Sequence, residues 1–353
     1  METYREYVGN PHVHTVYSDG VANHKEVAAA AEEAGLDFVI TTDHNVRPMQ
    51  MEGYYGGILL LVGEEVHNVR SHPSANHLLT YATQKEMAPY SFGSTRTLLK
   101  AVQEHQGIAY IAHPIEKAGR AQPGLEPIPW TAWPAHRIRG FELWNYMSEF
   151  KGLLWSKLAA LIYALAPGLG IRGPYRATLK LWDELLSQGQ RISVIGGSDA
   201  HGLTYRLGPF ERQIFSYTHL FRCVNTHVLC RESLIGDPDH DRALIYEALR
   251  SGRTWVGYDR PHSTRGFQFV IRSGSDQAVA GQELKRLSAI NVDVQLPAPG
   301  RISLLRDGQV IKREVGRRLS HTSVEPGIYR VEVHRRYRAH RVGWIYSSPI
   351  YIY

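Results

Sequence analysis

The stretch NPHVHTVYSDG, Asn10 to Gly20, places two histidines one residue apart and follows them with an aspartate between Ser18 and Gly20. In a strand, side chains at positions i and i+2 point to the same face, so we expect His12 and His14 to project together from a strand end. Two imidazoles placed in this way can share a metal ion. An isolated pair is more commonly two partly exposed histidines, and the rest of the chain decides between the two interpretations.

Up to about residue 205 the sequence repeats one theme, a short apolar run that ends in residue types that bind metals. The runs are YVGNPHVH, LDFVITTDHN, GILLLVGEEV, HLLTYA, GIAYIAHP, GFELWN and RISVIGGSDAH. Helix patterns lie between several of them; residues 23–35, for example, begin with an Asn cap and a Glu three residues later and end on Gly. This alternation predicts an α/β fold with a parallel sheet, and closure into a barrel is compatible with it. In such barrels the chemistry lies at the C-terminal ends of the strands.

The polar ends of these runs form the candidate metal-binding set. It consists of His12, His14, Asp19, His44, Glu65, His77, His113, Asp199 and His201. Each could be a core histidine or a capping carboxylate by itself, but nine of them at successive strand ends suit two or three divalent ions with positions left for water and substrate. No thiolate belongs to the set, so Zn, Mn and Fe are all compatible, and we expect no organic cofactor. Three divalent ions against three carboxylates leave a positive formal charge, which favours an anionic small-molecule substrate.

Four motifs carry a resemblance to a known family. HVHTVYSDG, TTDHN, IAHP and GGSDAH occur in the order found in the PHP superfamily, named for polymerase and histidinol phosphatase, which residues 1 to about 260 resemble. LFRCVNTHVL and the ending GWIYSSPIYI resemble the branch of PHP metallohydrolases that includes carbaryl hydrolase, so the resemblance extends over nearly the whole chain. It implies a distorted seven-stranded (β/α) barrel over residues 1–260, followed by a small all-β sandwich over residues 261–353.

The resemblance also implies a division of the ligands among three metal ions. The first ion would take His12, His14 and Asp199, with Glu65 bridging to the second. The second would also take His77 and His113, and the third would take Asp19, His44 and His201. Whether Glu64 or Glu65 is the bridging ligand stays open at this point, because neighbouring residues of a strand point to opposite faces.

Further residues near these motifs are candidates for other roles. Asp199 either accepts the proton of the attacking water or acts purely as a ligand, and Asp43 and Glu142 would orient ligating histidines. Arg206 as a catalytic group and Arg47 as a binding group would hold an anionic phosphoryl group, although salt bridges at the surface are the commoner fate of such arginines. Weaker candidates for hydrogen bonds to the substrate are Asn45 and Tyr205.

Two segments depart from the strand and helix alternation. Residues 114–134 contain five prolines with Trp130 and Trp133, which is typical of a lid or pocket wall. The apolar helix expected over 155–166 would either roof the site with them or pack on the outside, so we place a lid or insert at about 114–172. After residue 261 the pattern changes to two-residue alternation, with Asp307-Gly308 as a hairpin signal, which predicts the sandwich. Its default role is packing or association with a second copy.

Composition limits the partners. Hydrophobic residues make up 43% and charged residues 21% of the 353 residues, as in ordinary globular proteins. METYREYVGN lacks the features of a secretory signal, so we expect a cytoplasmic protein with reduced cysteines and without a membrane partner. The net charge of +6 comes from the C-terminal part, where fifteen Lys and Arg stand against seven Asp and Glu from residue 261 onward. Because no nucleic-acid module is recognisable, we interpret RRYRAHR, residues 335–341, as a solvated strand or turn.

Three function classes remain. The favoured one is a phosphoesterase for small phosphomonoesters or phosphodiesters, in which a hydroxide between two metal ions attacks phosphorus. The second is a hydrolase of an uncharged carbamate, aryl ester or amide, in which Trp130, Trp133, Trp144 and Trp155 would form an apolar pocket. The third is a non-catalytic metal-binding module, against which the completeness of the ligand set argues.

Overall fold

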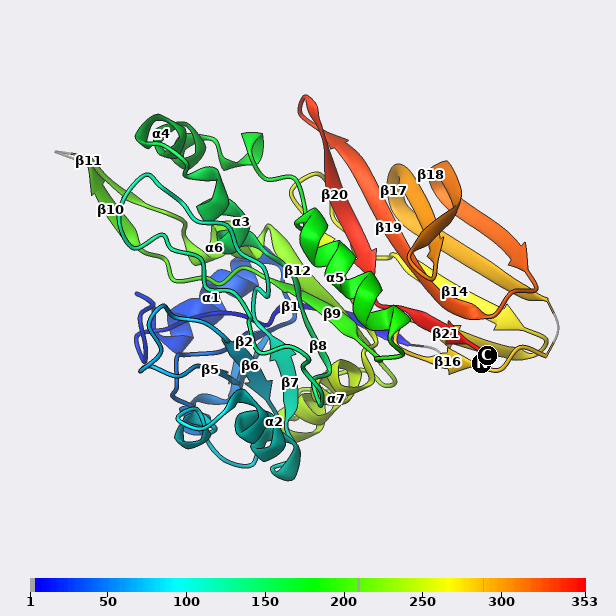
Figure 1. The fold of residues 1–353 in the computed structure, drawn as a ribbon, viewed down its shortest axis with the longest axis horizontal. Helices are drawn as coiled ribbons and strands as arrows, with labels where there is room; N and C mark the ends of the chain where they lie inside the picture. Colours follow the sequence, from blue (N-terminus) through cyan, green and yellow to red (C-terminus); the bar gives the residue numbers. More distant parts are fainter. Residues whose placement is uncertain (1–3, 208–209, 288) are drawn as a thin grey trace.

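The chain has a mixed α/β part followed by a C-terminal part built of strands (Figure 1). The computed structural model describes residues 4–207, 210–287 and 289–353, without the side chains of residues 205–207 and 210. The strands are β1 (Arg5–Asn10), β2 (Phe38–Thr41), β3 (Gly53–Tyr55), β4 (Ile58–Val62), β5 (Glu64–Val66), β6 (Leu78–Tyr81), β7 (Ile108–Ile111), β8 (Gly140–Asn145), β9 (Ser193–Gly197), β10 (Thr204–Leu207), β11 (Phe210–Gln213), β12 (Val224–Cys230), β13 (Thr254–Tyr258), β14 (Gln268–Ser273), β15 (Asp276–Val279), β16 (Glu283–Leu284), β17 (Ile290–Arg306), β18 (Gln309–Ser323), β19 (Gly327–Tyr337), β20 (His340–Ser347) and β21 (Ile350–Ile352).

The helices lie mostly in the first two thirds of the chain. They are α1 (His24–Ala34), α2 (Thr95–Glu104), α3 (Tyr146–Leu153), α4 (Lys157–Leu165), α5 (Arg176–Ser187), α6 (Tyr217–Phe221) and α7 (Pro238–Ser251), with short 3-10 turns η1 (Met49–Met51), η2 (Ala88–Tyr90) and η3 (Pro167–Leu169). The helix predicted from the capping signals of residues 23–35 is confirmed. Asn23 and Glu26 form a reciprocal capping box at the start of α1, and Gly35 ends it with a φ of 79°. No helix in the described parts of the chain is long and apolar enough to cross a membrane.

The strands form two main sheets rather than one closed barrel. The larger follows the order β15-β14-β17-β19-β20-β13-β12-β1-β2-β4-β3, with β16, β18 and β21 at its sides, and the smaller follows β5-β6-β7-β8-β9. Parallel pairs join β1 to β2, β2 to β4, β7 to β8 and β8 to β9, as the alternation of strands and helices predicted. Within the described residues, no continuous ladder joins the two sheets, so the expected barrel is not closed by hydrogen bonds.

Isolated bridges mark the places where the two sheets meet. Val13 pairs with Ala200, and His44 pairs with Glu65. β1 ends at Asn10 because Pro11 has no N–H with which to extend the ladder. The pair His12 and His14 therefore lies just beyond the end of β1, on either side of the Val13 bridge. The sheets thus meet at the residues that the sequence analysis singled out.

The C-terminal strands continue the larger sheet and pack on the first part of the chain. β13 pairs with β20 in the register Trp255 to Ser347. The predicted hairpin at Asp307-Gly308 is confirmed, since both residues have positive φ and join β17 to β18. Helix α5 lies between the two parts, because Trp182 contacts Phe141 of β8 and also lies beneath the guanidinium of Arg330 in β19.

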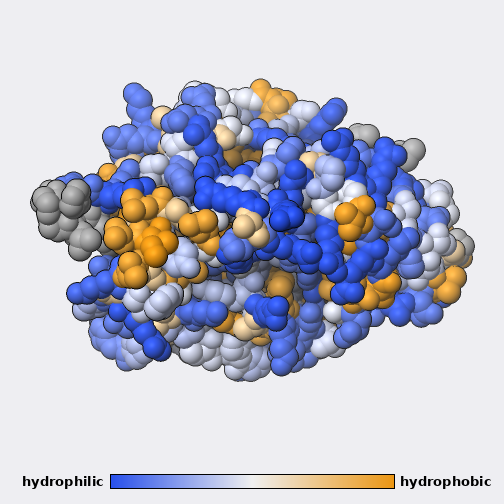
Figure 2. Space-filling model, turned by 90° about the horizontal axis from the view of Figure 1, so that it is seen from above, coloured by the Kyte–Doolittle hydropathy of each residue, from blue (hydrophilic) through white to orange (hydrophobic). Residues whose placement is uncertain are grey.

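The predicted insert at 114–172 has a mixed outcome. Residues 113–139 contain no helix or strand, as its prolines suggested, but the range also includes β8, which pairs with β7 and β9 inside the smaller sheet. Helix α4 does not bury its apolar face, since Leu158, Leu161 and Leu165 are exposed, and Figure 2 shows an apolar patch beside the grey atoms on its left.

The four tryptophans do not form one pocket. Trp144 is buried against Tyr258, and Trp155 is 64% exposed. Trp130 is buried, and its ring contacts the half-buried Trp133. The expected apolar pocket of all four is therefore wrong, because β8, the connection between α3 and α4, and the 114–134 segment hold them in different surroundings.

Candidate metal centre

Glu65 on β5 lies at the centre of a buried group of histidines. Its Oε2 faces three histidine nitrogens at 3.1 to 3.2 Å: His12 Nε2, His14 Nε2 and His44 Nδ1. Its Oε1 faces two others, His77 Nδ1 at 2.8 Å and His113 Nε2 at 3.2 Å. Because each oxygen addresses a different set, one carboxylate connects two groups of potential ligands.

Glu64 points away from this group. Its carboxylate accepts hydrogen bonds from the backbone N–H groups of Met87 and Ala88, at 2.7 and 2.8 Å. Burial raises the pKa of Glu64 to about 7. Of the two neighbouring glutamates, the structure therefore directs Glu65 toward the histidines.

The first group brings together residues that follow a strand of the larger sheet and residues that follow a strand of the smaller sheet. His12 and His14 follow β1, and Asp199 follows β9. Asp199 Oδ1 lies 3.3 Å from His12 Nε2 and 3.2 Å from His14 Nε2. A φ of 56° at Asp199 turns the chain sharply after β9. With Glu65, these residues can offer ligand atoms within 4.8 Å of one another.

The second group consists of Glu65, His77 and His113, all buried. His113 follows β7, and His77 precedes β6. β6 runs antiparallel to β5 and β7, so its beginning lies at the edge where β7 ends. The two imidazoles consequently approach the same carboxylate oxygen from neighbouring strands.

The third group is nearer the solvent. It consists of His14, Asp19, His44 and His201. His201 Nε2 lies 3.2 Å from Asp19 Oδ1, and the rings of His14 and His201 stack at 4.1 Å between centroids. The side chain of Asp19 is 53% exposed, whereas Glu65 is 1% exposed. The nine residues of the three groups, which we call the central cluster, are thus accessible from the side of Asp19.

Unpartnered buried nitrogens test whether the central cluster fits metal ions. His12 Nε2, His14 Nε2 and His44 Nδ1 are buried and have no hydrogen-bond partner among the described residues. Buried polar atoms nearly always have a partner, so three such atoms aimed at one carboxylate require an explanation. Divalent cations provide it, because neutral imidazole and carboxylate are the ligands that such ions take. The clusters therefore indicate a site for more than one metal ion.

Electrostatics leads to the same conclusion. Burial by itself lowers the pKa of His12, yet Asp199 and its neighbouring carboxylates raise it well above its usual value. At His14 the effect of burial is also the weaker one, because the carboxylates of Asp199 and Glu65 raise the pKa to about 9. Burial lowers the pKa of His44 to about 3. Several buried carboxylates thus favour positive charge beside them. Bound metal ions would supply this charge, so the histidines need not be protonated.

Glu142 and Asp43 act on the histidines in different ways. Both carboxylate oxygens of Glu142 lie 3.2 Å from His12 Nδ1, and the carboxylate also accepts a hydrogen bond from the side-chain amide of Asn145. This contact leaves His12 Nε2 directed at Glu65. Asp43 acts less directly. Within the part of the chain that the structure describes, it accepts hydrogen bonds from Thr15 and Ser18, and Ser18 Oγ lies 3.4 Å from His14 Nδ1.

The structure places the candidate substrate-binding residues in different surroundings. Arg47 donates hydrogen bonds to the carbonyl oxygens of Val62 and Thr83, which fixes its guanidinium to the backbone. Asn45 accepts a hydrogen bond from the backbone N–H of His67. The side chains of Tyr205 and Arg206, which belong to the β10–β11 hairpin, lie outside the described residues, so their roles stay predictions.

His67 is a residue that the sequence analysis missed. Its ring stacks on His77 at 4.2 Å between centroids and meets His44 edge-on at 4.8 Å. It can offer a ligand atom together with these two histidines. The signal was available, because His67 follows Glu65 at the i+2 spacing that drew attention to His12 and His14.

Comparisons with known proteins assign no family. No protein-family model matches the chain, and no curated protein matches it. A solved two-domain protein from Bacteroides vulgatus ATCC 8482, which contains a predicted PHP-like metal-dependent phosphoesterase, is 16% identical, with a TM-score of 0.45 and coverage of 98% of this chain and 95% of that chain. A solved structure from Bifidobacterium adolescentis ATCC 15703, described as a predicted metal-dependent phosphoesterase, is 15% identical, with a TM-score of 0.39. The match covers 55% of this chain and 87% of that chain.

Proposed function

We propose that the chain is a metal-dependent hydrolase and that it acts on small phosphoesters. The observation that supports this proposal most directly is the carboxylate of Glu65, whose two oxygens face separate groups of histidines. Glu65 would help to hold two divalent ions together with these histidines, as carboxylates do in hydrolytic two-metal sites. Such ions lower the pKa of a bound water and stabilise negative charge on the ester oxygens.

In this proposal the residues of the central cluster divide by their positions. Glu65 with His12, His14 and Asp199 forms the first site, and it shares Glu65 with the second. His77 and His113 complete the second site, and Asp19, His44 and His201 form the third. Glu142 keeps His12 in the orientation that the first site requires.

Asp199 is the proposed acceptor of the water proton. Its Oδ1 faces His12 and His14, whereas its Oδ2 accepts only a 3.3 Å hydrogen bond from Asn145 among the described side chains. Oδ2 is therefore the oxygen that can take a second hydrogen bond. Its side chain is 15% exposed, so water can reach it.

The accessible side of the cluster favours an anionic substrate. The third group is the most exposed, and it contains a single carboxylate among three histidines. Divalent ions held there would leave a net positive charge at the point of entry, by formal counting. A phosphoryl group compensates this charge, whereas an uncharged carbamate or aryl ester does not.

Steady-state hydrolysis tests the proposal. Chain reconstituted with Mn or Zn is assayed with p-nitrophenyl phosphate, its bis-ester and an aryl methylcarbamate, beside Glu65→Gln and the exposed control His340→Ala. We expect metal-dependent turnover of a phosphate that Glu65→Gln abolishes and His340→Ala retains. Turnover of the carbamate alone would move the chain to the class of neutral-substrate hydrolases. No turnover of any of them by the metal-loaded chain would contradict the proposal.

A further inference from the structure

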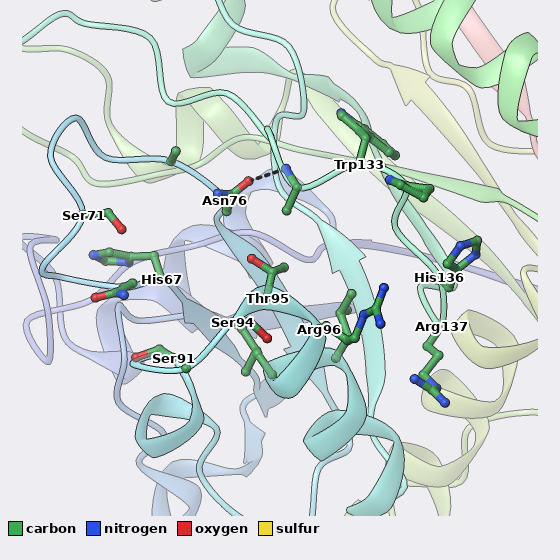
Figure 3. Close-up of a pocket in the computed structure, with 17 residues that line it drawn as sticks. His67, Ser71, Asn76, Ser91, Ser94, Thr95, Arg96, Trp133, His136 and Arg137 are labelled. Atoms are coloured by element: carbon green, nitrogen blue, oxygen red, sulfur yellow. Dashed lines mark hydrogen bonds between the residues drawn. The ribbon is translucent and has the colours of Figure 1, made fainter.

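A cavity of about 870 Å³ lies beside the central cluster. His67 lies on one side of it, and Arg96, His136 and Arg137 lie on the other side in Figure 3. Its walls come from the beginning of α2 and from the 132–137 part of the proline-rich segment. Asn76, which also lines the cavity, connects the segment before β6 to the proline-rich segment, because its side chain accepts hydrogen bonds from the backbone N–H groups of Thr131 and Ala132. The cavity is thus built from segments that flank the cluster residue His77.

The lining has the chemistry of an anion site with an apolar section. Arg96 and Arg137 contribute guanidinium groups, and no Asp or Glu belongs to the described lining. Neither guanidinium has an ion pair or a hydrogen bond within the described residues, and both residues are exposed at the cavity. Leu98, Leu99 and Trp133 supply the apolar section. Two free guanidinium groups without a nearby carboxylate favour phosphate or carboxylate groups of a ligand.

His67 connects this cavity to the central cluster. It lines the cavity and at the same time stacks on His77 and meets His44. His67 is thus shared by the cavity and the surroundings of the cluster, and a molecule that reaches both must extend past it. An apolar or flat middle section would contact Leu99 and Trp133.

We propose that the cavity binds a second anionic group of the substrate, so that the preferred substrates are organic phosphoesters with a phosphate or carboxylate remote from the ester that is cleaved. This inference rests on the proposed phosphoesterase function and adds the substrate class. Arg96 and Arg137 are its specificity-determining residues, since both line the cavity, Arg96 from the beginning of α2 and Arg137 from the 132–137 segment.

A chain-length series tests the inference. The kcat/KM of the metal-loaded chain is measured for alkanediol bisphosphates of increasing length and for alkyl monophosphates of the same lengths. We expect a preference for the bisphosphate at one optimal length. Replacing both arginines, as Arg96→Gln with Arg137→Gln, should lower the ratio of bisphosphate to monophosphate kcat/KM by at least about tenfold, because each lost charge-assisted hydrogen bond weakens binding. Lys100→Gln, on the same helix and paired with Glu104, is the matched control and should leave the ratio unchanged.

Binding to the metal-stripped chain gives a readout independent of activity. Calorimetry with an alkane bisphosphonate compares the chain, the double arginine variant and Lys100→Gln; we expect weaker binding by the double variant alone. Monophosphate turnover without any bisphosphate preference, together with equal binding by all three, would overturn the inference and leave the phosphoesterase function standing. Absence of turnover with every phosphate would instead remove the phosphoesterase function, and bisphosphonate binding would then decide by itself whether the cavity is an anion site.

Discussion

Glu142 holds several parts of the central cluster at once. Its carboxylate contacts His12 Nδ1, accepts the backbone N–H of His113 and accepts the side-chain amide of Asn145. Carboxylates that orient ligating histidines typically change metal affinity by about 10- to 100-fold when replaced. We therefore expect Glu142→Gln to weaken metal binding by about this factor, measured by competition with a chromophoric chelator.

The matched control for this variant is Glu33→Gln, a replacement of an exposed glutamate on α1. It should bind metal as the unchanged chain does. Equal metal affinity for Glu142→Gln and Glu33→Gln would show that His12 keeps its orientation without Glu142.

Glu149 gives a pH dependence of stability that is separate from the cluster. Burial raises the pKa of Glu149 from its usual 4.5 to about 7, even though Trp144 Nε1 and the backbone N–H groups of Arg172 and Gly173 donate hydrogen bonds to it. Between these pH values the folded chain holds a proton that the unfolded chain releases. The free energy of unfolding should therefore fall as the pH rises from 4.5 to 7, on the order of 3 kcal/mol in total.

Urea unfolding at pH 5 and pH 8 measures this effect. Glu149→Gln is neutral at both values, so relative to the variant the unchanged chain should be less stable at pH 8 than at pH 5. Parallel pH profiles for the two chains would contradict the assignment.

At the scale of elements, helix α1 shows how a local signal contributes to stability. Asn23 accepts a hydrogen bond from the backbone of Glu26, and Glu26 accepts one from the backbone of Asn23. Losing such a cap costs about 1 kcal/mol. Asn23→Ala should lower the free energy of unfolding by this amount and leave the metal content unchanged, whereas Lys25→Ala, at an exposed position of the same helix, should have a much smaller effect. An unchanged unfolding free energy for Asn23→Ala would mean that packing alone holds the start of α1.

Most elements could be predicted because their signals are local. The caps of α1, α2 and α7, the Asp307-Gly308 turn and the apolar runs of β2, β7 and β9 depend on residues a few positions apart. The bridging ligand could be narrowed to Glu64 or Glu65. Alternation along a strand places these two side chains on opposite faces, but it does not tell which face meets the cluster. The surroundings of Trp144 and Trp155 depend on contacts with residues far away in the sequence. The sequence pattern therefore predicted one shared pocket for them, whereas the structure places them in different surroundings.

At the scale of the whole molecule, the C-terminal strands complete the first part of the chain. The domain boundary expected near residue 260 falls just after β13, whose edge pairs with β20. Trp144 of β8 also contacts Tyr258 and Tyr346. The sequence indicated the change from mixed to all-β structure, but it could not show that one sheet would run through both parts, because strand pairing is not a local property.

This continuity predicts that residues 1–260 do not fold stably by themselves. Truncation would leave β13 as a bare edge and expose Trp144 and Tyr258, and exposed edges and apolar surface favour aggregation. Size-exclusion chromatography with light scattering should show aggregates for the fragment and a defined species for the full chain. A monomeric fragment with the metal content of the full chain would contradict the prediction.

The metal content of two neighbouring glutamate variants shows whether Glu65 and the histidines around it bind metal ions. After reconstitution and removal of free metal, inductively coupled plasma mass spectrometry gives the number of ions per chain for the unchanged protein, Glu65→Gln and Glu64→Gln, with circular dichroism to confirm folding. We predict two or three ions in the unchanged chain and in Glu64→Gln, whose carboxylate faces Met87 and Ala88, and loss of ions in Glu65→Gln. An unchanged chain that retains no metal, or a folded Glu65→Gln that retains all of it, would contradict the account.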